Sequence, residues 1–199
     1  MVYREGRLTM CGRYLFVEKD EEMQEWVAMA EPGTKFSTHE VYPTQSSLVI
    51  VKNESLMTTG MQWGFVKWDD KGRIINARQE TVASSPFFKT SFEHNRCIIL
   101  ASGFYEWDQH KDRYLIRLKD QSVQYMAGVY QIKDGQRMFA ILTQAAQPDF
   151  EVIHNRQPVF LNKKDIEPYL SFDIHENAIL TPRKWNFDIT SMRIQQSLF

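Results

Sequence analysis

A succession of short β-like segments, separated by turn residues, most constrains how this chain can fold. Each segment is rich in Val, Ile, Tyr and Phe, and turn-forming pairs such as Asp134-Gly135 stand between them. Many short strands with few helices are typical of a closed or strongly curved antiparallel sheet. We therefore predict an α+β fold, with a curved or barrel-like, mainly antiparallel β-sheet and a few flanking helices; parallel βαβ architecture fits poorly. The predicted strands are 47–52, 56–63, 96–101, 113–118, 124–131 and 138–143.

Three segments are predicted to be helices. In residues 18–30, Met23, Trp26 and Val27 recur at helical spacing among acidic residues, and Pro32-Gly33 follows the run. Shorter helices are predicted over 86–93 and 163–170. The length of 199 residues suits one domain with a single core, which we place over residues 10–199.

The charge balance limits the classes of partner. A formal net charge of −1 excludes a protein-wide basic field, so any contact with nucleic acid must come from a local patch. Two cysteines, Cys11 and Cys97, cannot complete a four-ligand zinc site, and we predict neither a metal nor a cofactor. Because no apolar run has the length of a signal peptide or membrane span, we expect a cytoplasmic protein without a membrane partner.

The stretch MCGRY, at residues 10–14, places a methionine directly before a cysteine. If Cys11 were the first residue, its α-amine would be partly neutral near pH 7 and could attack an aldehyde to give a Schiff base. The neighbouring thiol would then close a thiazolidine ring. As an internal residue, Cys11 is more typical of a small core side chain than of a nucleophile.

The stretch at residues 75–81 carries Asn76 and Arg78. Asn76 has the donors and the acceptor that suit an amine or a sugar hydroxyl, and the planar guanidinium of Arg78 suits a phosphate. The alternative is that Asn76 caps a helix, with Arg78 and Glu80 in solvent.

Two further residues are candidates for proton transfer. Glu106 lies between Tyr105 and Trp107 in a strand-like run, and a carboxyl among aromatic rings can have a raised pKa, as a general acid requires. Alternation along the strand could equally direct Glu106 into water. His154 precedes Pro158 in HNRQPV; a histidine suits proton transfer at neutral pH, although a lone one is often structural.

Aromatic and basic residues alternate in a third region. Trp63 and Trp68 lie close in sequence to Lys67, Arg73 and Arg78, a mixture typical of a platform on which unpaired bases stack. The alternative is that Trp63 belongs to the core and is followed by a glycine turn at Gly64.

Together these stretches resemble the family of SOS response-associated peptidases, whose domain protects abasic sites in single-stranded DNA. The resemblance covers residue 10 to about residue 190, in the family's order. It rests on MCGRY at 10–14, WGF at 63–65, NARQET at 76–81, SGFYEW at 102–107 and HNRQPV at 154–159.

The resemblance implies a catalytic role for four residues. In that family the initiator methionine is removed and the exposed cysteine captures the ring-opened aldehyde of an abasic site as a thiazolidine. By position, Cys11 corresponds to the crosslinking residue and Asn76 to the residue that positions it. Glu106 corresponds to the acid–base group that assists ring opening and Schiff-base formation, and His154 to the second proton-transfer group. The same Schiff base implies weak lyase activity.

The resemblance also implies how DNA is bound. Arg13 and Arg78 correspond to contacts with the DNA backbone, and Trp63 to an aromatic residue near a bend in the DNA. The implied partner is single-stranded DNA that contains abasic sites. We expect a monomer that associates with the nucleoid when it is bound to DNA.

Three departures from the family qualify these roles. HEVYPTQ, at 39–45, stands where the family usually has an asparagine-containing turn, which puts some DNA contacts in doubt. Gln157 stands where methionine is common, a change expected to alter only packing. Residues 1–9 precede the family's start; since Arg4-Glu5-Gly6-Arg7 can be encoded by purine-rich codons typical of a ribosome-binding site, we expect this leader to be a mis-assigned start.

Two other functions stay open. A cysteine peptidase would use Cys11 and His154, with Asn76 or Glu106 as the third member of a triad. A non-catalytic module would bind single-stranded DNA without any role for Cys11.

Overall fold

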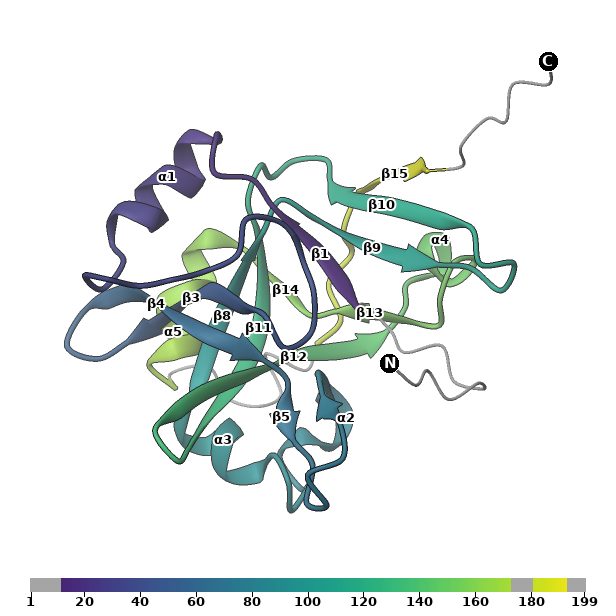
Figure 1. Cartoon of the computed structure of the whole chain (residues 1–199). Helices are drawn as coiled ribbons and strands as arrows, with labels where there is room; N and C mark the ends of the chain where they lie inside the picture. Colours follow the sequence, from purple (N-terminus) through teal and green to yellow (C-terminus); the bar gives the residue numbers. More distant parts are fainter. Residues whose placement is uncertain (1–11, 173–180, 193–199) are drawn as a thin grey trace.

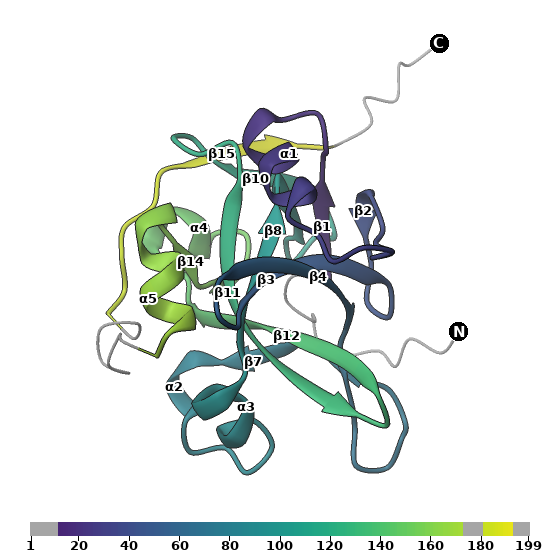
Figure 2. The same cartoon turned by 90° about the vertical axis from the view of Figure 1, so that its left-hand side faces the viewer.

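The computed structural model describes residues 12–172 and 181–192, and the predicted leader and Cys11 lie outside these ranges. The described strands form a closed barrel and a second sheet beside it (Figure 1). Helices lie around the outside of the strands (Figures 1 and 2). No helix among the described residues is long and apolar enough to cross a bilayer. The predicted fold class is confirmed.

Five strands pair in a closed ring, in the order β12-β4-β3-β8-β11 and back to β12. Four of the five pairings are antiparallel, whereas β12 and β4 run parallel. In a closed ring with an odd number of strands, neighbouring strands cannot all be antiparallel, so at least one pair must be parallel. The ring consists of β3 (Ser46–Lys52), β4 (Leu56–Trp63), β8 (Arg96–Ala101), β11 (Gln124–Lys133) and β12 (Gln136–Ala145).

The second sheet is antiparallel, in the order β15-β10-β9-β1-β2. The chain passes from the barrel into this sheet at Ser102, the single residue between β8 and β9. Ser102 fixes this crossing, because its amide donates to the carbonyl of Leu15 and its hydroxyl accepts from the amide of Val17. The sheet consists of β1 (Arg13–Phe16), β2 (His39–Val41), β9 (Gly103–Trp107), β10 (Arg113–Leu118) and β15 (Phe187–Ser191).

Short strands extend the barrel at one end. β7 (Asn76–Arg78) runs parallel to β12, and β13 (Arg156–Pro158) pairs antiparallel with the same strand. β14 (Phe160–Leu161) pairs with β11, and β5 (Phe65–Val66) and β6 (Arg73–Ile74) form a separate hairpin. β12 therefore places the segment that contains Asn76 close to the segment that follows His154.

The helices are short. α1 (Glu21–Ala28) starts later than the predicted 18–30, because Asp20 caps it by accepting the amide of Met23. Trp26 anchors α1 to the barrel by donating its indole N–H to the hydroxyl of Tyr125 over 3.0 Å. The others are α2 (Gln79–Val82), α3 (Lys89–His94), α4 (Pro148–Glu151), the 3₁₀ helix η1 (Lys163–Asp165) and α5 (Ile166–Leu170).

Close packing inside the barrel depends on Gly128 in β11. A β-carbon at this position would lie 2.3 Å from Cδ1 of Ile99 and 2.9 Å from the carbonyl oxygen of Ala140. Glycine at this position lets the neighbouring strands β8 and β12 pack this closely against β11.

Candidate active site

Glu106 and His154 come together from separate parts of the chain. Glu106 lies in β9, and His154 lies in the loop between α4 and β13. Their side chains are 3 % and 8 % exposed, and 3.7 Å separates Nε2 of His154 from Oε1 of Glu106. Glu106 therefore points inward, and the solvent-facing alternative for it is wrong. A buried carboxyl beside an imidazole is an arrangement that can move protons.

The surroundings of His154 fix its tautomer. The backbone N–H of Arg156 donates to Nδ1 of His154 over 3.1 Å. A nitrogen that accepts a hydrogen bond carries no proton, so we assign the proton of the neutral ring to Nε2, which faces Glu106. Nε2 therefore faces the carboxylate, and the 3.7 Å between Nε2 and Oε1 is longer than a hydrogen bond.

Asn76 and Arg78 lie in a strand. β7 sets Asn76 opposite Ile141 and Arg78 opposite Thr143 of β12. The helix that follows has Arg78 at its N-cap position, without a capping side-chain bond, so the prediction that Asn76 caps a helix is wrong. Asn76 is partly buried, whereas Arg78 is exposed.

An ion pair joins the NARQET and HNRQPV segments. Both guanidinium Nη atoms of Arg156 donate to the carboxylate of Glu80, over 2.6 and 2.8 Å, and one of them also donates to the carbonyl of Thr143 over 2.6 Å. Burial tends to raise the pKa of Glu80, but the hydrogen bonds and charge of Arg156 outweigh it and hold that pKa below its usual value. Glu80 is exposed, as the alternative interpretation of this stretch expected, but it is paired with Arg156, which had no predicted role.

Arg13 is held on one face of the second sheet. Its guanidinium donates to Glu40 over 3.1 Å and lies against two aromatic rings, at 4.3 Å from the centroid of Tyr42 and 5.2 Å from that of Trp107. Glu40 belongs to the segment that departs from the family's usual turn. An arginine fixed in this way can present donors to a phosphate at small entropic cost.

Trp63 requires a correction. Its side chain is 0 % exposed, its indole N–H donates to the carbonyl of Ile75 over 3.1 Å, and its ring stacks on Phe139. A fully buried ring offers no face to a base, so the platform predicted from Trp63 and Trp68 does not form, and the core alternative holds. Trp68 is 78 % exposed.

Only one of the two cysteines lies among the described residues. Cys11 lies outside the described residues. Cys97 is fully buried in β8, and burial raises the pKa of its thiol far above the usual value, which makes it a poor nucleophile. Within residues 12–172 and 181–192, no group of three or more His, Cys, Asp or Glu side chains could hold a metal ion.

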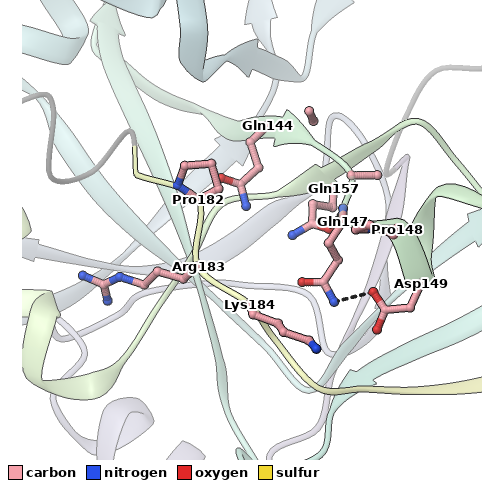
Figure 3. Close-up of a pocket in the computed structure, with 10 residues that line it drawn as sticks. Gln144, Gln147, Pro148, Asp149, Gln157, Pro182, Arg183 and Lys184 are labelled. Atoms are coloured by element: carbon pink, nitrogen blue, oxygen red, sulfur yellow. Dashed lines mark hydrogen bonds between the residues drawn. The ribbon is translucent and has the colours of Figure 1, made fainter.

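A cavity of about 630 Å³ lies elsewhere, and neither Asn76, Glu106 nor His154 lines it. Its walls come from the end of β12, the start of α4 and residues 182–184. Figure 3 shows Gln147 bonded to Asp149 at one side and Arg183 extending away from the other lining residues. Gln157 also lines this cavity, and its side-chain oxygen accepts the backbone N–H of Gln147 over 2.9 Å. The Gln157 side chain is therefore hydrogen-bonded as well as buried.

A family model described as SOS response associated peptidase (SRAP) matches residues 10–196. The chain belongs to the SRAP family. This confirms the resemblance drawn from the five stretches. In this SRAP chain, Glu106 and His154 form one buried pair. Asn76 lies on β7, which pairs with β12, as does β13, the strand that follows His154.

Other comparisons agree. Two bacterial relatives of this SRAP chain are named abasic site processing proteins. YoqW of Bacillus subtilis (strain 168) is 31% identical over 180 residues, which cover 81% of this chain and 80% of YoqW. YedK of Escherichia coli (strain K12) is 27% identical over 184 residues, which cover 83% of this chain and 81% of YedK. A crystal structure of a protein from Bacteroides thetaiotaomicron matches with a TM-score of 0.77 at 19% identity over 92% of both chains, which supports the fold.

Proposed function

We propose that this SRAP protein senses abasic sites in single-stranded DNA and shields them by a covalent bond to Cys11, as the N-terminal residue of the mature chain. Membership of the family and the names of its relatives support the handling of abasic sites. The covalent step is inferred from the chemistry of an N-terminal cysteine. We further propose that the protein acts as a cytoplasmic monomer.

The buried pair of Glu106 and His154 carries this proposal. An abasic sugar is mostly a closed hemiacetal, so its capture needs proton transfer at the ring oxygen before an amine can attack. A carboxylate and an imidazole 3.7 Å apart can exchange a proton with the same substrate. Their low exposure limits competing transfer to bulk water.

The reaction balances without a cofactor. The neutral α-amine of Cys11 adds to the aldehyde carbon, and the carbinolamine loses one water to form a Schiff base. The thiol sulfur then adds to the imine carbon while the nitrogen takes up a proton, which closes the thiazolidine ring. Glu106 and His154 pass the protons, with Nε2 of His154 as the donor set by its tautomer. If a base instead removes the C2′ proton of the Schiff base, a C2′–C3′ double bond forms as the 3′-phosphate leaves, and the strand is cleaved, which is the proposed lyase activity.

The remaining residues bind and orient the DNA. Asn76 would hold the amine or the sugar hydroxyl, and Arg13 and Arg78 would contact phosphates. Trp63 has no place in this interface, because its ring is buried in the core.

The peptidase alternative has less support. A thiol–imidazole pair needs one ring nitrogen to accept the thiol proton while the other is oriented by a partner. In His154, Nδ1 accepts from the backbone and Nε2 faces Glu106. A peptidase triad would need Nε2 to accept the thiol proton, whereas the assigned tautomer already places a proton on Nε2.

The experiment is incubation of a protein that starts at Met10 with an oligonucleotide containing one abasic site. We expect an adduct that survives heating in denaturant, its loss in Cys11→Ala, and its retention in the matched control Cys97→Ala. Intact mass should show that Met10 has been removed. An adduct that forms equally in Cys11→Ala would refute the proposal, as would the absence of any adduct.

A second measurement, of DNA affinity, distinguishes the non-catalytic alternative from covalent capture. Equal affinity for abasic and intact single strands, without any adduct and indifferent to Cys11, would indicate a binding module. Cleavage of peptides by the full 199-residue chain would instead indicate a peptidase.

A further inference from the structure

Two arginines share one carboxylate on the second sheet. Glu40, in β2, accepts from Arg13 of β1 over 3.1 Å and forms a closer ion pair with Arg113 of β10. The hydroxyl of Tyr42 also donates to Glu40, over 2.8 Å. We call Arg13, Glu40 and Arg113 the Arg–Glu–Arg cluster. Its formal charge is +1.

The register of the sheet explains why these side chains meet. Arg13 lies opposite Tyr105, and Arg113 lies opposite Trp107, so both arginines share the face of β9 that carries these two rings. Glu106 stands between the rings in sequence and points to the opposite face. The cluster is therefore on the other side of the strand that carries the proposed acid–base residue, and Arg13 is two residues from Cys11.

Both guanidinium groups are fixed by aromatic rings. Arg113 lies 3.9 Å from the centroid of Tyr105, and Arg13 lies between Tyr42 and Trp107. The side chains of Arg13, Arg113 and Glu40 are 24 %, 27 % and 30 % exposed, so solvent and ligands can reach the cluster. The cluster still favours an anion. The Nε–H of each arginine is buried without an acceptor. Each guanidinium has five N–H donors, and Glu40 can accept hydrogen bonds from only some of them.

We propose that the Arg–Glu–Arg cluster is a phosphodiester site for the single strand, in which Arg113 is a DNA contact beside Arg13 and Glu40 lowers the affinity of both. This rests on the proposed function for the identity of the ligand. Glu40 holds both guanidiniums in place, and its negative charge offsets one of them. The site therefore binds phosphate more weakly than two uncompensated arginines would, which favours exchange along intact DNA until an abasic site is met.

The state of Glu40 is consistent with this role. Partial burial tends to raise the pKa of its carboxyl, but hydrogen bonds from Tyr42 and Arg113 and the charges of both arginines outweigh it, so that the pKa lies below its usual value. Glu40 is therefore ionised near neutral pH. It stands in the segment where the family is expected to have an asparagine-containing turn.

The test uses intact single-stranded DNA, which cannot form an adduct, and measures affinity by fluorescence anisotropy over a range of salt concentrations. Arg113→Gln should lower affinity about tenfold and reduce the slope of log K against log salt by about 0.7, the value for one phosphate contact on a single strand. Arg117→Gln is the matched control, because it makes the same charge change on the same strand but next to Gly103, away from the cluster. Glu40→Gln should raise affinity about threefold at low salt, because one repulsive charge near the phosphate is removed.

The outcomes separate the two proposals. If Arg113→Gln binds like Arg117→Gln, or if Glu40→Gln binds more weakly than the unchanged protein, the cluster is not the proposed site. Adduct formation with abasic DNA is measured on the unchanged protein and on the control Arg117→Gln, and the two should give the same level. Loss of the adduct in every protein, including the unchanged one, would overturn the covalent function and leave the affinity result standing.

Discussion

Replacing Glu80 by glutamine should weaken the link between the NARQET and HNRQPV segments. The change keeps the size of the side chain and removes the charge that receives two parallel hydrogen bonds from Arg156. The Arg156 side chain is 20 % exposed and that of Glu80 is 47 % exposed, so solvent screens the pair. Exposed pairs contribute about 0.2–1 kcal/mol, and two-point geometry places this one near the upper limit, at about 1 kcal/mol after that discount.

The pH dependence has a defined sign. The pKa of Glu80 is lower in the folded protein than its usual value, so the unfolded chain binds the proton more readily. The stabilisation is therefore complete above the unfolded pKa of about 4.3 and is lost as the pH falls through the lower folded pKa. We expect Glu80→Gln to be less stable than the unchanged protein at about pH 7, and the difference to shrink towards about pH 3.

Urea denaturation followed by tryptophan fluorescence measures this difference. With a slope of about 2 kcal/mol/M, a loss of about 1 kcal/mol moves the midpoint by about 0.5 M. Glu93→Gln is the control, because Glu93 pairs with Lys89 only at 3.8 Å on an exposed helix and should move the midpoint much less. Equal midpoints for the two variants at neutral pH, or a difference that persists in acid, would refute this account of the ion pair.

Three further predictions follow from the core and the site. Gly128→Ala should lower the free energy of unfolding by about 2 kcal/mol or more, seen as a lower Tm, because its β-carbon would lie 2.3 Å from Ile99; an unchanged Tm would contradict this packing. Trp63→Phe should cost about 2 kcal/mol through loss of the bond to Ile75 and a smaller buried ring, while DNA affinity of the folded protein stays the same; a selective loss of affinity would return Trp63 to the interface. His154→Gln should slow adduct formation about 10²-fold or more in single-turnover assays with little change in DNA affinity, and an unchanged rate would remove His154 from proton transfer.

The strands were the most predictable part of the fold. Strands 56–63, 96–101 and 113–118 have the predicted ends, because β-branched and aromatic runs bounded by turn residues define both ends locally. Helices were less well bounded. The predicted helix 18–30 contracts to Glu21–Ala28, since Asp20 caps it, and 163–170 divides into a 3₁₀ turn and α5.

Pairing of the strands was not predictable from local pattern. Alternation does not say that β12 closes the ring by running parallel to β4, nor that β7 also lies parallel to β12. Both parallel pairs join segments far apart in the sequence. The strand β7 placed Asn76 outside the helix that the sequence allowed it to cap.

What the sequence by itself determined was the set of strands, the fold class and the five stretches that carry the family resemblance, because these depend on residue types and their order. It left open which way each side chain points. Glu106 could face water or the interior, and Trp63 could face DNA or the core, since alternation gives two faces without saying which is covered. Only the tertiary structure decided these cases: packing of the second sheet buried Glu106 beside His154, and closure of the barrel buried Trp63. Whether a side chain is buried depends on contacts with segments that are distant in the sequence. These contacts therefore decide which way each side chain at the site points.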